Sequence, residues 1–174
     1  MLKKSRKFYF LLTIAVGLAT YQPISQAADG DDALFGLKWG MSIIEVRRLG
    51  ISLQKVKGDG NLEVFTTKSV PKELSNAEAY TLVFADGKLV KQNYIGNNIT
   101  GDIYGTDGKE RYEALKGALT EKYGTPSSNH QYIGEKLYKD SDEFYQCLAY
   151  DGCGVWITFF RSTDKDLMLE LKGL

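Results

Sequence analysis

The chain has 174 residues, of which 25% are charged, and its 22 basic and 22 acidic side chains leave no formal net charge. Without residues 1–27 the balance would be 18 basic against 22 acidic side chains, and this mild acidity argues against a nucleic-acid-binding protein, which needs a basic face. One histidine and two cysteines also supply few ligands for a zinc site.

Residues 1–27 have the pattern of an export signal. A head with four basic residues precedes an apolar run over 8–19, and small residues at 25 and 27 suit a signal peptidase. As a helix the run would span roughly 18 Å, well short of the ~30 Å hydrocarbon layer, which argues against a stable membrane anchor. We therefore expect cleavage after Ala27, with Ala28 as the alternative, and a soluble periplasmic or secreted product. Residues 28–174 would form a single α+β domain with 18 basic and 22 acidic side chains.

Residues 34–97 predict one helix followed by four strands. Ser42 and Glu45 form a capping box that starts a helix over 43–49, and Gly50 ends it. Alternating apolar residues over 51–56 and 62–66, and again over 80–84 and 89–95, predict two hairpins around glycine-containing turns. Trp39, just before the helix, is expected in the core, with a ligand platform as the alternative.

A long glycine-rich connection, 96–108, separates the two halves of the chain. Such loops tend to be functional or mobile. Its large apolar residues include Ile103 and Tyr104, which are candidates for partner binding if exposed and for a plug over the core if buried. The residues leave both possibilities open.

The second half, 107–172, repeats the order of elements. Asp107 and Glu110 predict a capping box, and Tyr112, Leu115 and Leu119 fall on one face of the helix that follows. Strands are expected over 129–133, 144–150, 155–161 and 167–172. The fold class is thus α+β, with two tandem helix-plus-antiparallel-strand units, 34–97 and 107–172, that form one sheet with the helices packed on one face.

Cys147 and Cys153 are expected to form a disulfide, because they are the only cysteine pair of a chain bound for an oxidising compartment. The bridge would fix the connection between the strands 144–150 and 155–160. A redox role is the alternative, but the spacing of the two cysteines differs from that of a Cys-x-x-Cys motif.

The segment Lys38-Trp-Gly-Met-Ser-Ile-Ile-Glu-Val resembles the helix start of small envelope proteins such as the lipoprotein subunit of the outer-membrane barrel-assembly machinery. The doubled helix-and-sheet plan is similar to that of the beta-lactamase inhibitory protein. That resemblance implies a protein that acts by surface contact, without carrying over any inhibitory residue.

The chain lacks the common nucleophile, zinc-protease and phosphate-loop motifs, so we expect neither an enzyme nor a bound cofactor. In the last two strands Trp156, Phe160 and Met168 are predicted to share an apolar stripe on the face opposite the helices. We therefore expect an exported protein-binding module of the inhibitor or immunity type, whose partner is another exported protein. An envelope maintenance or assembly factor is the alternative, and an enzyme that uses His130 is a third class.

Overall fold

The computed structural model describes residues 32–134, 137–162 and 165–173. The expected export signal and its cleavage point therefore lie outside the described residues. The described chain divides into two compact units: the first runs to Leu74 and includes Ala79–Tyr94, and the second comprises Ser75–Glu78 and the residues from Ile95 on.

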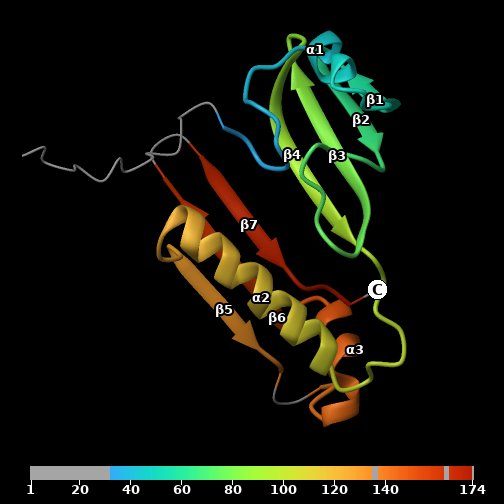
Figure 1. The fold of residues 1–174 in the computed structure, drawn as a ribbon. Helices are drawn as coiled ribbons and strands as arrows, with labels where there is room; N and C mark the ends of the chain where they lie inside the picture. Colours follow the sequence, from blue (N-terminus) through green and yellow to red (C-terminus); the bar gives the residue numbers. More distant parts are fainter. Residues whose placement is uncertain (1–31, 135–136, 163–164, 174) are drawn as a thin grey trace, which may run out of the picture. The chain divides into compact units, whose positions relative to one another are not determined.

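The first unit packs a short helix and its flanking loop against a four-stranded antiparallel sheet (Figure 1). Helix α1 (Ile43–Arg48) has the predicted capping box, in which the Glu45 amide donates to Ser42 Oγ over 3.2 Å and the Ser42 amide donates to Glu45 Oε2 over 2.7 Å. The strands β1 (Gln54–Asp59), β2 (Leu62–Thr67), β3 (Ala77–Ala85) and β4 (Lys88–Gly96) follow in chain order. Both predicted hairpins are confirmed.

The core of this unit follows from the alternation of its strands. Phe65 of β2 lies opposite Leu82 of β3, so both side chains are on the same face of the sheet. Trp39 packs, partly buried, against this core. The buried cluster consists of Ala33, Leu37, Val46, Ile51, Phe65, Leu82, Phe84 and Leu89.

The second unit places helix α2 (Thr106–Tyr123) over a three-stranded antiparallel sheet of β5 (Ser128–Tyr132), β6 (Val155–Arg161) and β7 (Asp166–Glu170) (Figure 1). The α+β class is thus confirmed, but the prediction of one sheet is wrong, since the described strands form two separate sheets. Periodicity identifies strands, whereas the joining of two hairpins depends on which strand edges meet. The single domain and the internal duplication stay predictions.

The strand predicted over 144–150 is also wrong. Those residues form the helix α3 (Phe144–Ala149), preceded by the 3₁₀ turn η1 (Ser141–Glu143). Asp140 and Glu143 form a capping box that starts the turn. Phe144, Cys147 and Leu148, three and four residues apart, are the buried side chains of α3. The second unit therefore has a helix where the first has its second strand.

Candidate protein interface

The three-stranded sheet has one face covered by helices. At its centre the hydroxyls of Tyr112 on α2 and Thr158 on β6 are 2.5 Å apart, and Thr158 donates to Asn129 Oδ1 on β5. Trp156, two residues before Thr158, packs edge-on against Phe144 of α3 with ring centroids 5.3 Å apart. Burial is the main reason that the pKa of Tyr112 is raised. Both α2 and α3 thus lie on the Trp156 and Thr158 face of the sheet.

The prediction that Trp156, Phe160 and Met168 share one exposed face of the sheet is therefore wrong. The pairing of β6 with β7 sets Phe160 opposite Leu167 and Phe159 opposite Met168. Phe160 is only 4% exposed, on the helix-covered face, whereas Met168 is 55% exposed on the other. Alternation shows which residues share a face within one strand, but the length of the turn decides which faces of two strands coincide.

The opposite face of this sheet, here called the open face, combines apolar and polar side chains. Tyr132 is 53% exposed, His130 is exposed, and Ile157 and Phe159 are half-buried between the two outer strands. From the pairing of the strands, the open face consists of Ser128, His130, Tyr132, Val155, Ile157, Phe159, Arg161, Asp166, Met168 and Glu170.

The loop before α2 contains a turn at 102–105, here called the anchor turn. Its organising group is the Asp102 carboxylate, which accepts hydrogen bonds from the Thr106 amide at 2.8 Å, the Gly108 amide at 3.0 Å and the Tyr145 hydroxyl at 2.9 Å. The carboxylate thereby satisfies amides at the start of α2 and ties the turn to α3. The N-cap position itself is Gly105, which has no side chain to offer.

The predicted capping box of Asp107 and Glu110 is consequently wrong, because α2 starts at Thr106 and both residues lie inside its first turns. The role of Asp102 was missed by the sequence reading. A carboxylate three residues before a glycine at a helix start is the signal that points to it. Tyr145, on a segment that was expected to be a strand, could not be found in this way.

The ionisation of this group follows from its contacts. Partial burial acts to raise the pKa of the Asp102 carboxyl, but the hydrogen bonds from the Gly108 amide and the Tyr145 hydroxyl outweigh it, so the pKa is lowered. Burial, together with the hydrogen bond to Asp102, raises the pKa of Tyr145. The pair is therefore a carboxylate and a neutral phenol at neutral pH.

Close packing also fixes the end of the anchor turn. Gly105 has a φ of +70°, and a Cβ at that position would collide with the Phe144 ring. Lys109 Nζ donates to the Tyr104 carbonyl over 3.2 Å and lies 4.0 Å from the centroid of the Phe144 ring. The backbone of the turn is thus held on both sides.

Between these fixed points Ile103 and Tyr104 are turned outward, each 53% exposed. The sequence left open whether the two residues are exposed anchors or a buried plug, and the structure places them on the surface. The hydrogen bonds on both sides of the turn hold the backbone that presents this isoleucine and tyrosine, so the backbone would have little conformational entropy left to lose on binding a protein partner.

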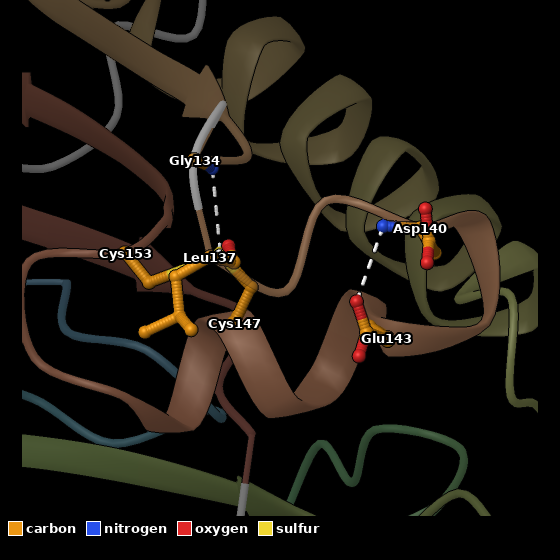
Figure 2. Close-up of a disulfide and its surroundings, with 6 residues drawn as sticks. All are labelled: Gly134, Leu137, Asp140, Glu143, Cys147 and Cys153. Carbon is orange, nitrogen blue, oxygen red and sulfur yellow. Dashed lines mark hydrogen bonds between the residues drawn. A yellow bond between two sulfur atoms is a disulfide. The ribbon is translucent and has the colours of Figure 1, made fainter.

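The predicted disulfide between Cys147 and Cys153 is confirmed, with the two Cα atoms 5.1 Å apart (Figure 2). The bridge connects α3 with the segment before β6, and not two strands as expected. Both cysteines are buried, and the Gly134 amide lies 3.4 Å from Cys147 Sγ. The buried position suits a structural bridge. An open hollow lies beside it, lined by Tyr132, Ile133, Gly134, Leu137, Tyr150, Asp151, Gly152 and Cys153.

The described residues contain no group of three or more His, Cys, Asp or Glu side chains that could hold a metal ion. His130 is exposed on β5, opposite Ile157. Within the described part of the chain, no helix combines the length and apolar character that a membrane crossing needs.

Comparisons with protein-family models, with the curated proteins and with the solved structures find no match to this chain.

Proposed function

We propose that this chain is an exported, non-enzymatic protein-binding module that acts by surface contact with another exported protein, as an inhibitor or immunity protein does. The observation that carries the proposal is the anchor turn, in which Asp102 and Gly105 hold the exposed pair Ile103 and Tyr104. The leader-like residues 1–27 support the location in the periplasm or outside the cell.

The energetics of interfaces support this choice of residues. A few large side chains carry most of the binding free energy of a typical interface, and tyrosine is enriched among them. Exposed apolar side chains on loose loops lose entropy when they bind, whereas the contacts of Asp102 order this turn in advance. The proposal therefore assigns Ile103 and Tyr104 the central contact, with the neighbouring charged and polar residues at its rim.

Site-specific photo-cross-linking in cells tests the proposal. A photoreactive residue at position 103 or 104 is expected to give one defined adduct with another exported protein. The same residue at position 44, in the other unit and 64% exposed as isoleucine, serves as the matched control. Equal, diffuse labelling from all three positions would contradict a specific contact through the anchor turn.

The phenotype of a deletion strain separates the two kinds of partner. Sensitivity to one toxin or release of one enzyme activity would identify an inhibitor or immunity protein. General weakening of the outer membrane would instead favour the alternative, an envelope maintenance or assembly factor.

A further inference from the structure

Among the described strands, four have an edge without a neighbour in their own sheet: β1 and β4 in the first sheet, and β5 and β7 in the second. The unpaired amides and carbonyls of an edge strand can pair with another chain. Proteins usually block such pairing by charge, proline, a bulge or a covering segment. The four edges of this protein differ in whether they carry such a device.

Two edges in the first unit are protected. Strand β1 contains a bulge between Lys55 and Lys57, which interrupts the regular edge. The start of β4 is covered by the segment before α1, because the Leu89 amide donates to the Met41 carbonyl over 2.8 Å and the Gly40 amide donates to the Leu89 carbonyl over 2.9 Å. Neither edge offers a full, flat row of backbone groups.

The edges of the second unit differ from each other in charge. Strand β7 begins at Asp166 and ends at Glu170, so antiparallel pairing with its own copy would set these two carboxylates opposite each other. Strand β5 reads Ser-Asn-His-Gln-Tyr and contains no proline, lysine or acid. Figure 1 shows β5 as an outer strand of its sheet, with β6 between it and β7. Among the described edge strands, β5 is the one for which we find neither charge, proline, a bulge nor a covering segment.

We propose that two copies of this chain form a dimer by antiparallel pairing of their β5 strands, centred on His130. In this register Ser128 lies opposite the partner's Tyr132, Asn129 lies opposite the partner's Gln131, and His130 lies opposite the partner's His130. A two-fold axis through this pair uses all five residues of the strand. The pair of Ser128 with the partner's Tyr132 and that of Asn129 with the partner's Gln131 each form twice, and the pair of the two histidines forms once, on the axis.

The faces of β5 agree with this register. His130 and Tyr132 are both exposed on the open face and gain cross-strand neighbours in the dimer. The opposite face stays under α2 in each copy, where Gln131 Nε2 donates to Glu113 Oε1 over 2.9 Å. The two sheets become one continuous sheet whose open faces lie side by side.

The pairing sets His130 beside the partner's His130 on the open face. A lysine introduced at position 130 would therefore meet its own copy across the strand pair, and like charges in that position repel each other. The charged groups on the same face are Glu170, which shares the neighbour Ile157, and the more distant pair Arg161 and Asp166. On the helix-covered face the nearest charged groups are Glu113 and Lys116, which pair with each other.

Sedimentation velocity of the purified chain, expressed with its own leader, tests the proposal across a concentration series. The unaltered chain is expected to form a dimer at neutral pH. H130K is expected to be monomeric under the same conditions, because two lysine ammonium groups would face each other. H130Q is expected to dimerise as the unaltered chain does. V56K, a lysine on the protected edge of β1, is the control and should behave as the unaltered chain.

Two results would overturn the proposal. One is an unaltered chain that stays monomeric at the highest soluble concentration. The other is a dimer that H130K leaves intact, since that dimer would use another surface. Circular dichroism of H130K keeps the experiment interpretable, because His130 is exposed and its replacement is expected to leave the fold unchanged.

Discussion

Asp102 shows how one side chain organises a local structure. Its carboxylate joins three donors from the start of α2 and from α3, so the loop before the helix is ordered without a capping side chain at Gly105 itself. We expect Asp102→Ala to lower the free energy of unfolding by about 1–3 kcal/mol, because two backbone amides and the Tyr145 hydroxyl lose a charged acceptor. Urea unfolding measures this loss. Asp151→Ala, in an exposed loop, should change it by less than about 0.5 kcal/mol.

The same carboxylate predicts a pH dependence. Its pKa is lower in the folded chain than in the unfolded chain, so its stabilisation is fully present above the unfolded value of about 3.9 and is lost as the pH falls through the folded value. Asp102→Asn should therefore flatten the decline in stability below about pH 4. Identical acid unfolding curves for the two proteins would mean that the carboxylate is unperturbed in solution.

Replacing Gly105 or Gly117 by alanine is expected to change the stability of the protein in opposite directions. Gly105→Ala is expected to cost at least about 2 kcal/mol, because the alanine would need a positive φ and would press on the Phe144 ring. Gly117→Ala, inside α2 where a Cβ meets no atom within 4 Å, should stabilise the protein by about 0.5–1 kcal/mol. Thermal unfolding of both variants provides the measurement, and equal shifts would contradict the packing at Gly105.

At the scale of elements, capping and turn residues in the sequence correctly predicted those helices and hairpins that local interactions determine. The Ser42 and Glu45 capping box and the Asp86-Gly87 turn, whose two residues both have positive φ, led to α1 and to the hairpin of β3 and β4. The prediction of a strand over 144–150 failed because Asp140 and Glu143, expected to lie in a turn, instead form a capping box before η1 and α3. A cap and a buried face at helical spacing outweighed strand propensity there.

The candidate site was predictable only in part, because it depends on two long-range arrangements. Ile103 and Tyr104 stood out as apolar residues among glycines, but their exposure follows from the contacts of Asp102 with Tyr145, 43 residues away in the chain. The stripe on the last two strands failed because the turn sets Phe159, and not Phe160, opposite Met168. Such registers are fixed by packing, which a single sequence does not display.

The disulfide gives a prediction for α3. The bridge closes a short loop between α3 and the segment before β6, so its loss should cost about 2.4 kcal/mol on the loop-entropy estimate. The double variant Cys147→Ser, Cys153→Ser tests this in urea, with the reduced unaltered chain as a second measurement. Since Gly134 lies close to both sulfurs, its amide should also exchange faster in the variant. Unchanged stability would contradict a structural role for the bridge.

At the scale of the whole molecule, the two compact units have different roles in the proposed account. The first unit is built around a tightly buried core, whereas the second carries the anchor turn, the open face, the disulfide and the β5 edge. The proposed protein contact and the proposed dimer use different parts of the second unit. A variant that breaks the dimer is therefore expected to keep the contact made by the anchor turn.

The central claim is that Ile103 and Tyr104 make the main contact with a protein partner. It is tested most directly by the affinity of the cross-linked partner, once purified, for the double variant Ile103→Ala, Tyr104→Ala, measured by titration calorimetry. We predict a dissociation constant at least about tenfold higher than that of the unaltered chain, with unchanged thermal stability and with normal affinity for Ile44→Ala. Equal affinities for all three proteins would contradict the account.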